Sequence, residues 1–262
     1  MQKELSVTQA QSKSETLYDQ IRADILSLRL APNTPLRLPA LSDRYGIGLT
    51  PLRECMNRLV GNQLVVPEHN KGFRVTPLTR SDLLDLESSR NAIEGAMFTY
   101  SVVHGDDAWE AGIVGAFYHL SQTPVPSAIL DNDALPVWTR RHEAFHCALV
   151  AGSRSVWMHR FAKQLEYQLG RYQRFIQSGL QDLANTAPRV ADHAADVFTT
   201  SMALDPHKAL YEAALSRNPT AARDAFNLHT GLSITAFEDL ATLMPTGSQF
   251  ATTLGLHTET LL

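Results

Sequence analysis

The chain has 262 residues, of which 44% are hydrophobic, and a formal net charge of −4, so it is long enough for two domains with their own cores. No apolar run reaches the roughly 18 residues of a membrane helix, and the polar first residues do not resemble a signal peptide. Two cysteines, Cys55 and Cys147, are too few for a disulfide framework. We therefore expect a cytoplasmic protein with reduced thiols and no membrane association.

The charge is divided unevenly along the chain. Residues 1–77 carry ten Lys or Arg and seven Asp or Glu, a net charge of +3, whereas residues 78–262 carry a net charge of −7. A basic first segment suits contact with phosphates, although an excess of this size also arises by chance. Strong salt dependence needs about 6 to 10 phosphate contacts. A homodimer would be required to supply that many.

The first part of the chain predicts short helices. We expect residues 1–13 to be disordered and residues 16–28 to form a helix, because apolar residues recur there on one face. Leu38 and Leu41 share the face of a second short helix, which Gly46 ends.

A third helix follows, and its two faces differ in character. Thr50 is a good N-cap residue, and Pro51 is tolerated in a first helical turn. The buried face is predicted to comprise Leu52, Met56 and Leu59. Arg53 and Asn57 lie on the opposite face, where they are free to contact a partner.

After this helix, two apolar segments, 64–66 and 73–75, flank a turn that contains Lys71 and Gly72. This pattern predicts a β-hairpin, and we expect no strand in the part of the chain that follows it. Helix, turn, helix and hairpin in this order form a winged helix-turn-helix, whose third helix enters a major groove of double-stranded DNA while the hairpin contacts a phosphate strand. Residues 14–77 are therefore predicted to bind DNA.

The sequence around the third helix resembles the GntR family of bacterial transcription regulators. Residues 47–56, IGLTPLRECM, follow the family's V-S-R-x-P-V-R-E-A-L, and residues 71–75 follow the wing's R-G-x-x-V. Gly48 and Leu49 stand where members usually carry Ser and a DNA-contacting Arg, so we expect one typical contact to be missing. The residues expected to contact DNA are Arg37, Arg44, Thr50, Arg53, Asn57, Lys71 and Gly72.

Residues 78–243 predict an all-helical domain. Turn signals such as Pro124–Pro126 and Gly152–Ser153 separate its helices. The predicted helices span residues 79–103, 106–121, 133–151, 155–178, 188–203, 205–217 and 219–240. Residues 244–262 are irregular and are expected to form a C-terminal tail. The fold class is therefore mainly α, with a winged helix-turn-helix followed by an all-α helical bundle.

Histidines give the clearest chemical signal in the helical half. His142 and His146 are four residues apart on one predicted helix, so they share a face and could bind one ion. Ten histidines in 262 residues give about 0.4 such pairs by chance, so the pair alone could be ordinary surface or core. His207, in the first turn of a later helix, and His229, in the middle of the last, strengthen the case for a shared site.

This half resembles the C-terminal ligand domain of the FadR subgroup, the FCD domain. Residues 142–146 match its D-x-x-x-H, residues 207–213 match H-x-x-[IL]-x-x-A, and Arg90 and Glu94 fit R-x-x-x-E. The resemblance implies a metal site formed by His142, His146, His207 and His229. Metal-binding members have Asp at the position of His142, so this histidine is either a substitute ligand or a sign that the site has been altered or lost.

The predicted ligands decide which metal and which effector suit the site. Four neutral imidazoles suit zinc, with nickel as an alternative, better than magnesium or calcium. Without a carboxylate ligand the site keeps the full divalent charge and suits a small organic-acid effector. The alternative is a polar cavity in which the histidines hold a carboxylate without metal. Arg90 could clamp the effector carboxylate or pair internally with Glu94.

Together these features predict a repressor that binds a palindromic operator as a homodimer and is released by a small anionic metabolite. Two alternatives differ in class. One is a metal-dependent hydrolase with an accessory helix-turn-helix, and the other is an architectural DNA binder without effector. The sequence contains no nucleophile elbow, phosphate-binding loop or paired carboxylates, so we expect no enzymatic activity.

Overall fold

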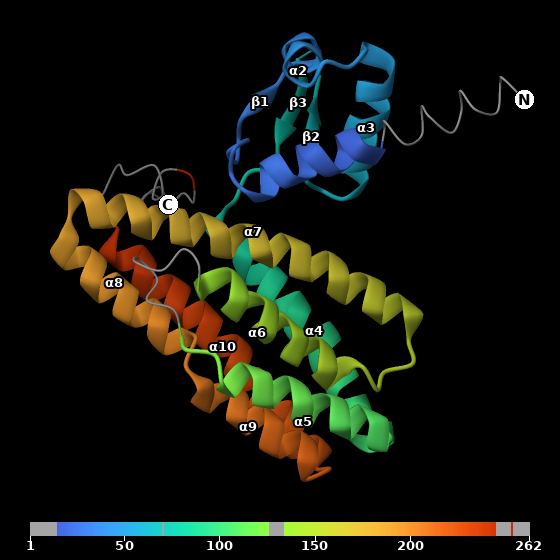
Figure 1. Ribbon diagram of the computed structural model, residues 1–262, viewed down its shortest axis with the longest axis vertical. Coiled ribbons are helices and arrows are strands. Elements are labelled where there is room, and N and C mark those ends of the chain that lie inside the picture. Colours follow the sequence, from blue (N-terminus) through green and yellow to red (C-terminus); the bar gives the residue numbers. More distant parts are fainter. Residues whose placement is uncertain (1–14, 70, 126–133, 245–252, 254–262) are drawn as a thin grey trace, which may run out of the picture. The chain divides into compact units, whose positions relative to one another are not determined.

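The computed structural model describes residues 15–69, 71–125, 134–244 and 253. The chain folds into two compact units, residues 1–79 and 80–262, which are described separately (Figure 1). The expected disordered residues 1–13, and the tail from residue 245 apart from residue 253, lie outside the described residues. None of the described helices is long and apolar enough to cross a membrane.

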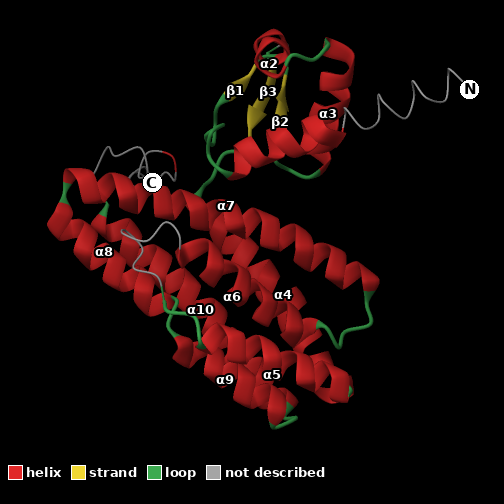
Figure 2. Ribbon diagram, viewed as in Figure 1, coloured by secondary structure: helices red, strands yellow, loops and turns green. Residues whose placement is uncertain are grey.

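The first unit combines three helices with a small sheet (Figure 2). A first helix covers residues 15–26. It is followed by β1 (Pro35–Leu36), α2 (Leu38–Tyr45), α3 (Leu49–Gly61), β2 (Val65–Glu68) and β3 (Gly72–Val75). The strands form one antiparallel sheet in the order β1-β3-β2. Strand β1 was not predicted, because its two residues are too short to show an alternating pattern, yet it pairs with β3. Beyond the wing, the described residues contain no strand, as expected.

The predicted buried face of α3 is confirmed. Leu52, Met56 and Leu59 are completely buried and pack with apolar residues of the first helix and of the sheet. Fully burying a side chain of this size stabilises the fold by about 1.5–3 kcal/mol. This burial fixes the rotation of α3, so that Arg53 and Asn57 are exposed on the opposite face.

The start of α3 differs from the prediction. Gly48 is the N-cap, with an extended backbone, and the helix begins at Leu49. Thr50 therefore lies inside the first turn with an exposed side chain, and its assignment as the N-cap was wrong. The predicted end of α2 is confirmed, because Gly46 adopts the left-handed conformation with φ of 62°.

A buried carboxylate ties α2 to the first helix. Asp24 accepts hydrogen bonds from Arg29 Nε at 2.7 Å, from Arg44 Nη2 at 3.2 Å and from Tyr45 Oη at 2.7 Å. Burial opposes the charge of Asp24, but these donors outweigh it and lower the pKa of its carboxyl below the usual value. The ionised carboxylate therefore fixes the end of α2 that leads into α3.

The described part of the second unit consists of helices joined by loops and turns. Its helices are α4 (Arg80–His104), α5 (Asp107–Ser121), α6 (Ala134–Val150), α7 (Val156–Thr186), α8 (Pro188–Ser201), α9 (Leu204–Leu215) and α10 (Pro219–Leu243). This is the predicted order, although α7 continues eight residues beyond the predicted end at residue 178. Helix α4 packs against both α10 and α7, while α5 packs against α6 and α9.

Aromatic side chains from three helices form the centre of this unit. Phe98 of α4, Phe145 of α6 and Phe226 of α10 are completely buried in one apolar cluster, which Leu210 of α9 joins. Truncating one such ring to alanine typically costs about 3–5 kcal/mol. The core therefore holds α4, α6, α9 and α10 in fixed positions relative to one another.

The wing turn depends on the backbone conformation of Gly72. Its φ is +96°, and a Cβ atom there would lie 2.8 Å from the Leu36 carbonyl oxygen. We expect Gly72→Ala to lower the free energy of unfolding by about 1–3 kcal/mol, because the substitution combines backbone strain with a clash. Urea denaturation monitored by circular dichroism would measure the change.

Gly61→Ala is the matched control. Gly61 ends α3, and an added Cβ would meet nothing within 4 Å. This change should leave stability equal or raise it by up to about 1 kcal/mol, since alanine favours helix. Equal effects of the two substitutions would contradict the structural role of Gly72.

Candidate metal centre and DNA-binding surface

The residues predicted to contact DNA are distributed over three elements of the first unit. Thr50, Arg53 and Asn57 have exposed side chains on α3. Arg37 is the N-cap residue of α2, and the exposed Arg44 lies in its last turn.

The remaining two predicted contacts lie at the wing. Lys71 is exposed at the turn between β2 and β3, and Gly72 begins β3. Arg44 and Gly72 also have roles within the fold, because Arg44 is paired with Asp24 and Gly72 lies against the Leu36 carbonyl. Thr50, Arg53, Asn57 and Lys71 project outward from a helix face and a hairpin turn, the two features of this domain that suit a DNA groove.

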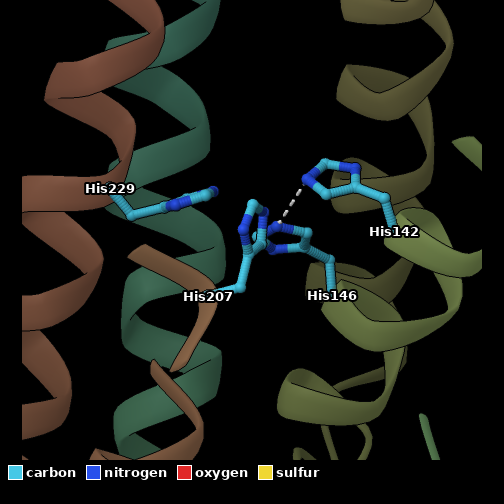
Figure 3. A group of neighbouring side chains, drawn as sticks. All are labelled: His142, His146, His207 and His229. Atoms are coloured by element: carbon cyan, nitrogen blue, oxygen red, sulfur yellow. Dashed lines mark hydrogen bonds between the residues drawn. The ribbon is translucent and has the colours of Figure 1, made fainter. Parts of the chain in front are cut away.

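The four histidines predicted as metal ligands lie together in the second unit (Figure 3). His142 and His146 come from α6, His207 from the first turn of α9 and His229 from the middle of α10. Each offers one ring nitrogen, and these four atoms lie within 4.8 Å of one another. The Nε2 atoms of His142 and His146 are 3.1 Å apart.

Two of these rings have a nitrogen without a partner among the described residues. His207 Nδ1 lies 2.8 Å from the Ala203 carbonyl oxygen, to which it must donate because a carbonyl only accepts. Its Nε2 atom therefore carries the lone pair, and that atom is buried without a hydrogen bond. His229 Nδ1 is also buried and unbonded. An unsatisfied buried polar atom costs about 1–3 kcal/mol, so the arrangement fits a site that receives a ligand.

Burial keeps the imidazoles neutral. It lowers the pKa of His142, His146 and His229 well below the usual value, and the neighbouring histidines and the positive charge of Arg90 lower it further. For His207, burial lowers the pKa to about 4. Neutral imidazole is the form that binds metal ions, so the cluster is in this form near pH 7.

The donor set fits a divalent transition metal. Zinc–nitrogen bonds are about 2.0–2.1 Å, so the nitrogens of a tetrahedral site are about 3.4 Å apart. The observed limit of 4.8 Å therefore requires the most distant rings to close by up to about 1.4 Å, by rotation of the side chains. Nitrogen ligands alone suit zinc, nickel or copper better than magnesium or calcium.

A buried charge cluster on α4 lies beside the histidines. Arg90 Nε is 3.1 Å from Glu94 Oε2, its Nη1 is 3.7 Å from Glu87 Oε2, and its Nη2 is 3.4 Å from His146 Nδ1. Burial opposes the charge of Arg90, but Glu94 and Glu87 outweigh it and raise the pKa of the guanidinium. Burial raises the pKa of Glu87. Sequence reasoning missed Glu87, although its spacing of three residues from Arg90 was a usable signal.

Two cavities adjoin the histidines. The larger, of about 460 Å³, has Arg90, His142 and His229 in its wall. The smaller, of about 160 Å³, also touches Arg90 and His142 and adds His146. Glu143 lines both cavities. A ligand in the larger cavity could therefore contact the histidine cluster and Arg90 at the same time.

Family models match most of the chain. The model described as bacterial regulatory proteins, gntR family, matches residues 13–75, and the FCD domain model matches residues 85–231. The chain is 30% identical over 244 residues to the uncharacterized HTH-type transcriptional regulator BphR of Paraburkholderia xenovorans, with 90% of each chain covered. It is 33% identical over 159 residues to the HTH-type transcriptional repressor GlaR of Escherichia coli, covering 61% of this chain and 71% of that protein.

Solved structures share the fold at low sequence identity. Escherichia coli McbR/YncC superposes with a TM-score of 0.57 at 15% identity, covering 87% of this chain and 98% of that chain. A putative transcriptional regulator GntR from Rhodococcus sp. RHA1 has the same TM-score at 18% identity, with the same shares covered. The family models and the relative BphR show that the chain belongs to the GntR family of DNA-binding transcription regulators and carries an FCD domain.

Proposed function

We propose that this regulator is a repressor that a small carboxylate-type metabolite releases from its operator. The observation that carries the proposal is the cavity of about 460 Å³ whose wall includes His142, His229 and Arg90. A cavity with convergent polar groups and perturbed pKa values is the usual form of a small-molecule site. The relative GlaR is named a repressor, which favours that sign of regulation.

Metal binding is part of the proposal. His142, His146, His207 and His229 would hold the ion, with zinc as the first candidate and nickel as the second. When bound, the ion supplies a positive charge that attracts an anionic group. The chain itself contributes Arg90, which extends the positive region along the wall of the cavity, and the buried surroundings strengthen both attractions.

The DNA-binding half of the proposal rests on exposed side chains. Thr50, Arg53 and Asn57 on α3 would contact bases or backbone in a major groove, while Lys71 would contact a phosphate from the wing. The predicted contact residues of one copy include four basic side chains, Arg37, Arg44, Arg53 and Lys71, fewer than the roughly 6 to 10 phosphate contacts that give strong salt dependence. A homodimer on a palindromic operator would supply two such surfaces.

The ligand would act by favouring one arrangement of the dimer over another. A coupling free energy of about 1–3 kcal/mol corresponds to a 5- to 150-fold change in operator affinity. Helix α4 carries Arg90 and begins at Arg80, where the second unit starts. A contact between the ligand and Arg90 would therefore act on the first helix that follows the DNA-binding unit in the chain.

The DNA surface is tested with Arg53→Ala. We expect this change to weaken operator binding by about 5- to 150-fold, because one base contact contributes about 1–3 kcal/mol, while binding at the cavity stays unchanged. Fluorescence anisotropy with the chain's own promoter region would measure it. Arg154→Ala, at an exposed arginine of the second unit, removes the same charge and should leave affinity nearly unchanged. Equal operator affinity of Arg53→Ala and the parent would refute the assignment.

The metal centre is tested with His146→Ala. After metal-replete purification, the parent should contain about one equivalent of zinc or nickel by elemental analysis, and the variant should contain much less. The variant should still bind the operator but respond weakly to effectors. His193→Ala, at an exposed histidine of α8, is the control and should keep the parent's metal content. Less than about a tenth of an equivalent in the parent would remove the metal from the proposal.

A further inference from the structure

The larger cavity has a polar end and an apolar end. Its polar end is formed by Arg90, His142 and His229. Its apolar wall is supplied by buried side chains of α4, α7 and α10, namely Leu83, Leu169, Ile176, Phe237 and Leu240. These five side chains are each at most 9% exposed. The cavity therefore offers one region suited to an anion and another suited to hydrocarbon.

The volume of the cavity exceeds the needs of a small polar acid. A volume of 460 Å³ corresponds to about 15 atoms at the roughly 30 Å³ that one water occupies in the liquid. A four-carbon dicarboxylate, with about eight non-hydrogen atoms, would fill little more than half of that space. A second carboxylate placed against the apolar wall formed by Leu83, Ile176 and Leu240 would be desolvated there at a cost.

The charges along the cavity favour a ligand with a single negative charge. Glu87 and Glu143 belong to the lining together with Arg90. Arg140 and Arg174, which also line the cavity, have exposed side chains. At the buried part of the lining, Glu87 would repel a second carboxylate of the ligand, whereas it would not repel an apolar body.

We infer that the effector is a monocarboxylic acid with an apolar body, an alkanoic or arylalkanoic acid of about 10 to 15 non-hydrogen atoms. The inference rests on the proposed function, since it assigns a chemical class to the effector of that site. The carboxylate lies at the end formed by Arg90 and the histidines. The hydrocarbon body lies between Leu83, Ile176 and Leu240.

A homologous series of acids tests the inference on the full-length, zinc-supplemented protein. Isothermal titration calorimetry would compare acetate, butanoate, hexanoate, octanoate and 4-phenylbutanoate with succinate and citrate. Each buried methylene should raise affinity about fourfold, so octanoate should bind far more tightly than acetate and more tightly than either polycarboxylate. Affinity that does not rise with chain length, or tighter binding of succinate or citrate, would overturn the assigned class, and so would no binding of any acid.

A second test places a larger side chain in the apolar part of the cavity. Ala236 lines the cavity on α10, one turn before Leu240 and seven residues after His229. Ala236→Phe should weaken octanoate binding at least tenfold but leave acetate binding and zinc content unchanged. Thr235→Phe, at the exposed neighbouring position, is the matched control and should preserve octanoate binding. If Ala236→Phe does not fold, Ala236→Leu should give the same pattern at smaller amplitude. Undiminished octanoate binding in a folded variant contradicts the assigned location.

Operator binding distinguishes a failure of the proposed function from a failure of the assigned ligand class. If the parent binds its promoter region and citrate or succinate releases it while octanoate does not, the proposed regulation stands and the ligand class is wrong. If the parent does not bind that DNA at low ionic strength, the proposed function fails independently of any acid. If octanoate releases the parent and Thr235→Phe from the operator but does not release Ala236→Phe, the result supports both the proposed function and the assigned ligand class.

Discussion

The gathering of four imidazoles around one point, three of them buried and His142 partly buried, is the constraint on which the helical unit depends. A bundle made only for stability would place apolar side chains there, because two of these rings have a buried nitrogen without a hydrogen bond. The cost is tolerated because Phe98, Phe145 and Phe226 form a well-packed core next to the cluster. The apolar core holds the helices that carry the four histidines in fixed positions.

The sequence predicted the parts of this arrangement that are periodic. Helix boundaries followed from apolar spacing and turn residues, and the shared face of His142 and His146 followed from helical geometry. Periodicity alone could not bring His207 and His229 to the same point, because that depends on how α9 and α10 pack. Their inclusion came from the resemblance to the FCD domain. The larger cavity was not predicted, because its walls come from helices far apart in the sequence.

The errors in the first unit have local causes. The N-cap of α3 was placed at Thr50 because its hydroxyl is a good cap, yet the extended backbone of Gly48 starts the helix earlier. Strand β1 has two residues and forms only because it pairs with the edge of β3, which no local sequence pattern reveals.

In the second unit, α7 continues through Gly179, because packing against α8 and α4 outweighs the low helix propensity of glycine.

The charges around the histidine cluster determine how many negative charges on the effector a bound metal ion would balance. With both glutamates ionised, Arg90, Glu87 and Glu94 together carry one negative charge beside neutral histidines, and a divalent ion would turn this into one positive charge. A single carboxylate then neutralises the site, whereas a second carboxylate would restore a net negative charge in a buried place. An aspartate in place of His142 would remove that positive charge before any ligand arrived. The histidine at this position and the apolar wall of the cavity therefore favour the same kind of ligand, one anionic group on a hydrocarbon body.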